Sequence, residues 1–352
     1  MADDRRILKV FTSVLEMMLH IYPMPLVMLR SLSAGAYEVW AKLEYFNPFS
    51  HSIKDRPVWN MIVKALKECI ECGKLYEATS GNVGIAMACL SNALGIEFRA
   101  YMPKPTPKLT EVLLKTLGTE VVKTDFETIS PEMINMVREI AKKESALNLN
   151  QFENDNNFEA HYKFTAKEID EQLKSINSSP PKAIIAGVGT SGHIAAISRY
   201  FKERYGDKVK IIGVVPAKGE KIPGIKRLET KPKWFFLEKI DKVVEVSRRD
   251  AIKEVVWIAR KEGLLIDLSA RAVTYGFKVV KEVYGPGVYV LIYPDDIFKY
   301  IEAVKALSTY LFTSSLICQY SELIIHLHII PVLYNSNYND INYNYLIDYR
   351  VG

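Results

Sequence analysis

Residues Pro181–His193 read PKAIIAGVGTSGH, an apolar run that passes directly into a glycine-rich turn. The run predicts a buried strand, and the residues after the turn predict a helix over His193–Arg204. Glycine lets the backbone approach a ligand closely, and the free N–H groups at a helix N-terminus attract phosphate. This segment therefore predicts a phosphate-binding loop between a strand and a helix of an α/β fold.

The glycines of this loop also match the dinucleotide-binding pattern, with Gly187, Gly189 and Gly192 at its three fixed positions. A dinucleotide site additionally needs an acidic residue at the end of the next strand, where it binds the ribose. The next predicted strand ends at Gly213–Pro216, which contains no acid. We therefore expect a phosphate-bearing ligand other than a nicotinamide dinucleotide.

Predicted strands and helices alternate along most of the chain, on both sides of this loop. Strands are expected at 75–79 and 209–216, for example, and helices at 82–94 and 272–284. Such alternation predicts parallel sheets that are covered by helices on both faces. Two series of this kind meet near residues 150–160, so we expect two three-layer α/β domains with a cleft between them.

The composition excludes several classes of protein. The chain has 352 residues, of which 49% are hydrophobic, and a formal charge of +5, too small to indicate a nucleic-acid or membrane-surface partner. Its four cysteines are too few for a disulfide framework and fit a reducing cytoplasm. The N-terminal MADDRRILKV lacks the apolar core of a signal peptide, and no apolar run is long enough to span a membrane. We expect a cytoplasmic protein without a metal site.

The C-terminal residues differ from the rest of the chain. From Thr313 onward charged side chains are scarce, and Tyr334–Tyr349 is dominated by asparagine and tyrosine. No helical or strand period fits this tract. We expect the main fold to end near Leu311 and residues 312–352 to form an atypical tail.

Thr79–Gly84, TSGNVG, is a second polar turn between a predicted strand and a predicted helix. Its hydroxyl, amide and backbone N–H groups are suited to binding a small carboxylate. The alternative is an ordinary helix N-cap, because serine and threonine are favoured at that position. A cap needs only one such residue, however, and this turn carries three polar side chains.

Asn47–Arg56, NPFSHSIKDR, places Lys54 just before a predicted helix. A lysine in this setting could form a Schiff base with a carbonyl cofactor. Taken by itself, such a lysine is more often a solvated surface residue. The three segments become informative when they are considered together.

Together they resemble the tryptophan-synthase-β-like (fold type II) family of pyridoxal 5'-phosphate enzymes, and within it the cysteine synthases. The resemblance runs in order from about Pro23 to Leu311 and implies pyridoxal 5'-phosphate as the cofactor. The loop that holds the cofactor phosphate more often has glycine and threonine where this chain has Ser191 and His193. The family fold implies a small mobile domain over 45–155 and a large domain over 156–311.

The N-terminal helix and strands, residues 1–44, are then expected to pack on the large domain, with the helix alternatively on a partner subunit. Relatives are homodimers, so a homodimer is expected here too. Carried over residue by residue, the resemblance makes Lys54 the catalytic lysine. It implies further cofactor contacts from Asn82, Gly187, Gly189, Thr190, Ser191, Gly192 and His193, and substrate contacts from Thr79, Ser80, Gly81, Asn82 and Gln151.

Two further positions concern specificity. Asp296, after the last predicted strand, falls where many relatives place a serine against the pyridine nitrogen, although a solvated turn aspartate is the alternative. Ile222–Arg227 and the longer lysine loop resemble archaeal O-phosphoserine sulfhydrylases. We therefore expect L-cysteine to be formed from O-phosphoserine and sulfide, with O-acetylserine as an alternative substrate. Arg227 is expected to bind the phosphate, because its planar guanidinium can contact two oxygens.

Other interpretations stay open. A serine/threonine dehydratase or a cystathionine β-synthase-like enzyme would have the same fold, and a pseudo-enzyme would bind the cofactor without turnover. Cys69 and Cys72 resemble a redox pair, but they end a helix instead of starting one, so a structural role is favoured. His51 is interpreted as a loop contact.

Overall fold

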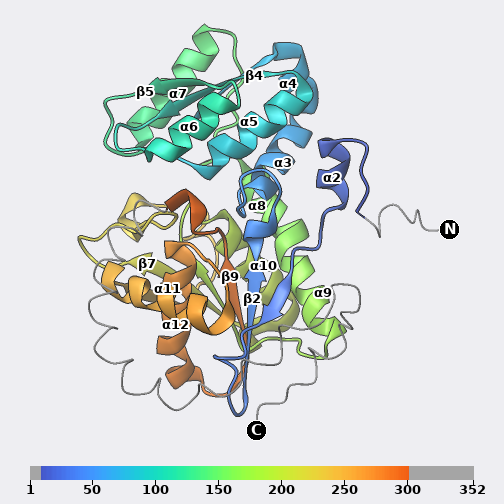
Figure 1. The fold of residues 1–352 in the computed structure, drawn as a ribbon, viewed down its shortest axis with the longest axis vertical. Helices are drawn as coiled ribbons and strands as arrows, with labels where there is room; N and C mark the ends of the chain where they lie inside the picture. Colours follow the sequence, from blue (N-terminus) through green and yellow to red (C-terminus); the bar gives the residue numbers. More distant parts are fainter. Residues whose placement is uncertain (1–8, 301–352) are drawn as a thin grey trace, which may run out of the picture. The chain divides into compact units, whose positions relative to one another are not determined.

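The computed structural model describes residues 9–300, so the expected boundary near Leu311 and the tail 312–352 lie outside the described residues. The described chain contains a six-stranded sheet, in the order β1-β2-β9-β6-β7-β8, and a three-stranded sheet, in the order β3-β4-β5 (Figure 1). Helices separate nearly all of the strands in sequence. The predicted α/β class is confirmed. Within 9–300 no helix is both long and apolar enough to cross a membrane.

The six-stranded sheet is parallel except for its first pair, β1 and β2, which run antiparallel. Every residue of β6 is buried, as expected for a central parallel strand with helices on both faces. On one face, Ile184 and Ile292 share a core with Ile169 and Ile197 from covering helices. The strands are β1 Leu26–Met28, β2 Tyr37–Leu43, β6 Ala183–Gly187, β7 Lys210–Pro216, β8 Lys242–Val246 and β9 Gly287–Tyr293.

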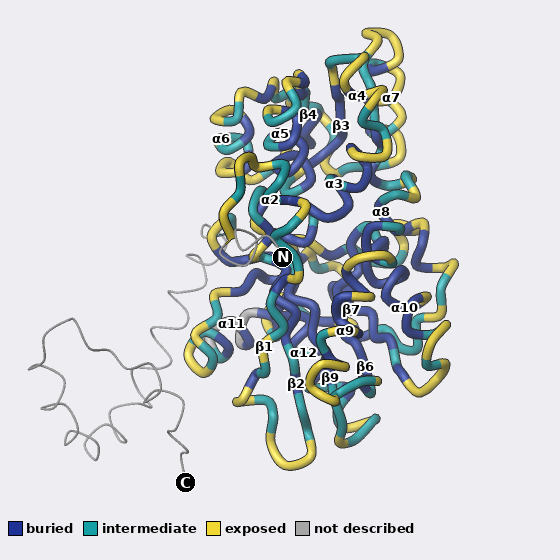
Figure 2. Tube along the Cα trace, turned by 90° about the vertical axis from the view of Figure 1, so that its right-hand side faces the viewer, coloured by how far each residue is buried: buried dark blue, intermediate teal, exposed yellow. Residues whose placement is uncertain are grey.

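The three-stranded sheet is entirely parallel, and each face has its own apolar core. Leu90 and Phe98 belong to the core on one face, while Tyr101 and Val137 belong to the core on the other. Figure 2 shows β3, β4, β6 and β7 as mostly buried, whereas α6 and α7 carry many exposed residues. The strands are β3 Lys74–Ala78, β4 Glu97–Met102 and β5 Glu120–Lys123, and the helices around them are α3 Asp55–Lys64, α4 Leu66–Cys72, α5 Asn82–Leu94, α6 Lys108–Thr116 and α7 Pro131–Lys143.

The helix predicted over 158–175 is three consecutive helical segments in the structure: α8 Asp155–Ala160, the π-helix η2 His161–Ala166, and α9 Lys167–Ser175. The wider turn of a π-helix is not visible in a hydrophobic pattern, and such turns are frequent at functional sites. The remaining helices are α10 Gly192–Tyr205, α11 Arg248–Glu262 and α12 Leu268–Tyr284, with short 3-10 turns η1 Glu44–Phe46, η3 Gly206–Lys208, η4 Leu228–Thr230 and η5 Phe298–Tyr300.

The first helix of the described residues, α2 Val14–His20, is capped by Ser13, whose hydroxyl accepts a hydrogen bond from the Glu16 N–H. Its Leu15 packs against the core between α5 and the three-stranded sheet. The expected packing of the N-terminal segment on the large domain or on a partner subunit stays a prediction. The strands β1 and β2 that follow do join the six-stranded sheet.

Candidate active site

A cavity is lined by residues from several of the loops in which the sequence analysis predicted site residues. Four of the expected site residues line it: Lys54, Asn82, Gly187 and His193. They come from the start of α3, the start of α5, the end of β6 and the first turn of α10. Further polar lining comes from residues that the sequence analysis did not select: Ser52, Asp267, Ser269, Asp295 and Tyr300.

Lys54 occupies the N-cap position of α3, directly before Asp55. Its backbone N–H lies 3.2 Å from the Ser52 hydroxyl, and the Ile53 N–H donates to the Pro294 carbonyl at 2.8 Å. Burial lowers the pKa of Lys54 to about 8, and the nearby ammonium of Lys226 acts in the same direction. The lysine is therefore held in the cavity with a substantial neutral fraction near neutral pH.

Asp55 fixes the loop that precedes the lysine. Its carboxylate accepts hydrogen bonds from the Phe49 N–H at 2.7 Å and from the Ser50 N–H at 2.9 Å. Burial raises the pKa of this carboxyl to about 6. The side chain next to Lys54 in sequence thus acts on the backbone, which leaves Lys54 as the group that faces the cavity.

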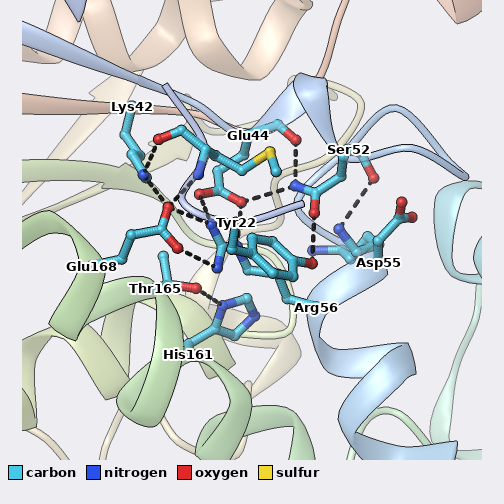
Figure 3. A network of polar contacts seen from close by, with 12 residues as sticks. Tyr22, Lys42, Glu44, Ser52, Asp55, Arg56, His161, Thr165 and Glu168 are labelled. Atoms are coloured by element: carbon cyan, nitrogen blue, oxygen red, sulfur yellow. Dashed lines mark hydrogen bonds and ion pairs between the residues drawn. The ribbon is translucent and has the colours of Figure 1, made fainter. Parts of the chain in front are cut away.

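A buried ionic network, drawn in Figure 3, fixes the start of α3 to β2, η1 and α9. Arg56 lies between two carboxylates, with 2.6 Å from its Nε to Glu44 and 2.9 Å from its Nη2 to Glu168. Lys42 forms an ion pair with the same Glu168. The Arg56 guanidinium lies over the Tyr22 ring, 4.3 Å from the ring centre. Because Arg56 is two residues from Lys54, the network also restricts where Lys54 can lie.

The phosphate-loop glycines are required by close contacts across the loop. A Cβ at Gly189 would lie 2.8 Å from the Gly224 carbonyl oxygen, and one at Gly192 would lie 2.5 Å from the Asn157 side-chain oxygen. A Cβ at Gly187 would likewise clash with the side chain of Ile225. These positions are therefore fixed by packing, and the backbone of the loop stays open to a ligand.

Two buried polar atoms of this loop lack a partner within the described chain: the Ser191 hydroxyl oxygen and the His193 Nδ1. Burial, with the nearby charge of Lys54, lowers the pKa of His193 to about 3, so its ring is neutral. Ser191 adopts the left-handed region with φ of +71°. Buried polar atoms without partners are costly, so their presence at a helix N-terminus points to a ligand that satisfies them.

The segments expected to hold the substrate carboxylate lie on either side of the end of β3. The Thr79 hydroxyl accepts from the Gly84 N–H at 2.9 Å, which is the capping contact. The Gln151 amide donates to the Ala78 carbonyl at 3.0 Å. Of the residues expected there, Asn82 lines the cavity, whereas the lining does not include Thr79, Ser80, Gly81 or Gln151.

Asp295, and not the predicted Asp296, faces the cavity. Its carboxylate accepts from the Asn82 amide at 2.5 Å and from the Tyr300 hydroxyl at 2.8 Å, and it forms an ion pair with Lys299. Asp296 instead accepts from the Phe298 N–H at 2.9 Å. Neighbouring residues after a strand point in different directions, and two consecutive aspartates gave no sequence signal to separate them.

Asp267 is a second carboxylate in the cavity that the sequence analysis missed. It caps α12, accepting from the backbone N–H groups of Ser269 and Ala270 at 2.9 Å each. Burial, and then the charge of Asp295, raise its pKa to about 7. The only sequence signal was a common N-cap pattern, Asp267-x-Ser269, which says nothing about a cavity.

Arg227 does not reach the cavity, which contradicts its predicted role. Its guanidinium contacts Glu229 at 2.8 Å, Glu245 at 3.1 Å and the Pro216 carbonyl at 2.8 Å. Lys226 takes the inward position instead, with its ammonium 5.0 Å from the centre of the Phe152 ring. Burial lowers the pKa of Lys226, and the described chain provides no carboxylate within ion-pair distance of it.

The chain is similar in sequence to known pyridoxal-phosphate-dependent enzymes. The family model described as "Pyridoxal-phosphate dependent enzyme" matches residues 17–295. A cysteine synthase of Aquifex aeolicus is 34% identical over 275 residues, which are 75% of this chain and 82% of that protein. Cysteine synthase B of Escherichia coli is 32% identical over 257 residues, 72% of this chain and 83% of that protein. Both are bacterial, so the likeness to archaeal O-phosphoserine sulfhydrylases stays a prediction.

Solved structures agree with the sequence comparison. An O-acetylserine dependent cystathionine beta-synthase from Helicobacter pylori has a TM-score of 0.73 at 25% identity, covering 83% of this chain and 98% of that one. A hydrogen sulfide-producing enzyme from Fusobacterium nucleatum has a TM-score of 0.72 at 29% identity, with the same coverage of 83% and 98%.

The residues present fit pyridoxal phosphate. The partnerless Ser191 hydroxyl and His193 Nδ1, with the N–H groups that begin α10, are suited to its phosphate. Lys54 would offer a buried amine to its aldehyde, and Asp295 would offer a carboxylate to its ring nitrogen. The phosphate, the aldehyde and the ring nitrogen would therefore each have a complementary group among these residues.

Proposed function

Because the chain belongs to the pyridoxal-phosphate-dependent enzyme family and is related to cysteine synthases, we propose that it forms L-cysteine from an O-substituted L-serine and sulfide. In this β-replacement the Cβ–O bond breaks, the Cβ–S bond forms, and the oxygen leaves with its substituent. Pyridoxal phosphate acts as the electron sink for the negative charge that develops at Cα. The protein residues orient the substrate and move its proton.

The observation that carries the proposal is Lys54, a buried amine with a pKa of about 8 in the same cavity as Asn82 and the phosphate loop. A base with a pKa near the working pH transfers protons efficiently. Lys54 is therefore proposed to take the proton from Cα and to return it after sulfide has added. Asn82, Thr79 and Gln151 are proposed to bind the substrate carboxylate.

The proposed leaving group is phosphate, and Lys226 supports this choice. A half-buried ammonium without a carboxylate partner in the described chain is stabilised when an anion binds. Its position next to Gly224 and Ile225, which line the cavity, brings it near the substrate. A phosphate dianion benefits from this cation, whereas the neutral acetyl group of O-acetylserine gains much less.

The test is turnover with O-phospho-L-serine, O-acetyl-L-serine and L-serine, each with and without sulfide. We expect cysteine, with the highest kcat/KM for O-phosphoserine. Pyruvate from serine in the absence of sulfide would instead identify a dehydratase. Binding of the cofactor without any turnover would identify a pseudo-enzyme.

Variants at the two adjacent cations test the choice of leaving group. Lys226→Met should lower kcat/KM for O-phosphoserine about 10- to 100-fold, the scale of a charge-assisted hydrogen bond, and change O-acetylserine turnover much less. Arg227→Met is the matched control and should change both by less than about threefold, since its partners are surface carboxylates. Equal losses on both substrates in Lys226→Met would refute phosphate recognition by this lysine.

A homodimer is also part of the proposal. It is tested by the molar mass of the cofactor-loaded protein in light scattering, for which twice the 40.1 kDa of the chain is expected.

A further inference from the structure

Glu77 is a buried carboxylate that neither the predicted site nor the proposed chemistry uses. It lies in β3, two residues before Thr79, and is 1% exposed. No lysine or arginine of the described chain lies within ion-pair distance of it. A buried carboxylate without a cation is expensive to keep, so its contacts need an explanation.

Apart from the backbone of the neighbouring Ala78, the hydrogen-bond partners of Glu77 belong to one loop from a distant part of the sequence. One of its oxygens accepts from the Asn150 N–H at 3.0 Å, and the other lies 3.4 Å from the Gln151 N–H. The Asn148 amide reaches Glu77 at 3.4 Å and donates to the Tyr76 carbonyl at 2.7 Å. Glu77 therefore supplies the acceptors that hold residues 148–151 against the end of β3.

The loop needs such an anchor. Asn150 has φ of +51°, a conformation that costs energy for a residue with a side chain. The Gln151 carbonyl accepts from the Asn157 amide at 2.8 Å, and the other end of that amide lies against Gly192 in the phosphate loop. The anchored loop thus runs from the end of β3 to the phosphate loop.

We infer that Glu77 is a positioning residue: it holds the Asn150–Gln151 backbone so that Gln151 and the Thr79–Asn82 turn form a single site for the substrate carboxylate. The inference rests on the proposed function for the identity of that substrate. Geometry carries it, since Glu77 precedes one half of this site on β3 and hydrogen-bonds the backbone of the other half.

Its protonation state is compatible with this role. Burial raises the pKa of Glu77 to about 8, so near pH 7 the side chain is largely neutral. A neutral side chain does not repel the carboxylate of an incoming amino acid. It also makes glutamine a close mimic, because the glutamine carbonyl can still accept the 3.0 Å hydrogen bond from the Asn150 N–H, and only the longer 3.4 Å contact with the Gln151 N–H is lost.

The experiment compares Glu77→Gln, Glu77→Asp and Glu77→Ala in the cofactor-loaded enzyme. The alanine and aspartate variants should raise KM for the O-substituted serine tenfold or more, because a shorter side chain cannot reach the loop. KM for sulfide and cofactor loading, measured by absorbance, should be unchanged. The value of kcat should stay within about threefold of the wild type. Glu77→Gln should stay within threefold of the wild type throughout. Glu144→Ala is the matched control, since Glu144 contacts Tyr76 on the same strand but not the loop.

Hydrogen–deuterium exchange of the segment 148–152 supplies a readout independent of turnover. Uptake in this segment should rise in the alanine and aspartate variants of the cofactor-free protein and stay at the wild-type level in Glu77→Gln. An unchanged uptake in Glu77→Ala, or a Glu77→Gln variant as impaired as Glu77→Ala, would overturn the inference. If the alanine variant does not fold, the exchange and the KM of the aspartate variant test the inference instead. A wild type that forms no cysteine would refute the proposed function, whereas the exchange result would still test the anchor.

Discussion

Two clusters of buried charged residues lie near Lys54: one surrounds Arg56, and the other lines the cavity. They differ in whether their carboxylates are paired with cations. In the network of Figure 3, Glu44 and Glu168 face Arg56 and Lys42, so two carboxylates meet two cations. In the cavity, Asp267 is hydrogen-bonded only to neutral donors within the described chain.

The pKa values record this difference. Burial by itself would raise the pKa of Glu168, but Arg56 and Lys42 hold it below its ordinary value. Burial raises the pKa of Asp267 to about 7, and Asp295 adds to the effect instead of opposing it. The balanced cluster therefore stabilises the folded chain near Lys54, whereas Asp267 has no ion-pair partner within the described residues and its ionisation costs free energy.

The largest effect is expected at Lys54, which lines the cavity and lies two residues before Arg56 in the sequence. Lys54→Ala should reduce cysteine formation by at least about 10³-fold, because the proton acceptor at Cα and the covalent attachment of the cofactor are lost together. After borohydride reduction, the wild-type peptide containing Lys54 should carry the mass of the cofactor. Lys64→Ala, an exposed lysine at the other end of α3, is the control and should retain both properties. A Lys54→Ala variant that still retains the reduced cofactor covalently would contradict the assignment.

The balanced cluster is expected to respond in stability. Glu44→Gln keeps the shape of the side chain but leaves one uncompensated positive charge in a buried site, so it should lower the free energy of unfolding by about 3 kcal/mol. Urea denaturation of the cofactor-free protein measures this. Glu144→Gln breaks a partly exposed pair with Arg99 and should cost less than about 1 kcal/mol. Equal losses in the two variants would mean that the network is no more important than a surface ion pair.

The comparison also explains which features the sequence could predict. The strand, glycine turn and helix over 181–204 form β6 and α10, because apolar periodicity and glycine spacing are local properties. Lys54 and Asn82 could be placed in one site because their segments resemble two motifs of the same family, which a local pattern alone would not have joined. The domain boundaries drawn from the resemblance stay a prediction.

The charged residues that surround Lys54 could not be ranked in this way. Whether Asp295 or Asp296 faces the cavity, and whether Lys226 or Arg227 does, depends on the direction of each side chain and on partners far away in sequence. Glu77 was missed for the same reason, since its partner loop begins more than seventy residues later, as the separations of 71 to 74 show. Burial of a charge is a tertiary property, and no local pattern reports it.

The smallest effect, and the sharpest contrast with Glu44, is expected at Asp267. A carboxyl whose pKa is raised from 3.8 to about 7 by folding stays protonated while the unfolded chain has lost its proton. The free energy of unfolding therefore falls as pH rises from about 4 to 7 and stays reduced above pH 7. Asp267→Asn removes the titrating group and keeps an N-cap, because asparagine caps a helix as well as aspartate.

In the cofactor-free protein at pH 8, the variant should therefore be more stable than the wild type by about 1–2 kcal/mol. The full pKa shift would correspond to ~4 kcal/mol, but a smaller gain is expected because a buried site relaxes when its carboxyl is charged. The gain should be smaller at pH 5, because the wild-type side chain is then mostly neutral. Urea denaturation at the two pH values measures this gain in the free energy of unfolding. The control is Asp125→Asn at an exposed aspartate, which should leave the free energy of unfolding unchanged at both pH values. A gain of equal size at both pH values would show that Asp267 acts through packing and not through its charge. A loss at pH 8 would show that its charge is balanced after all, and the contrast between the two clusters would then fail.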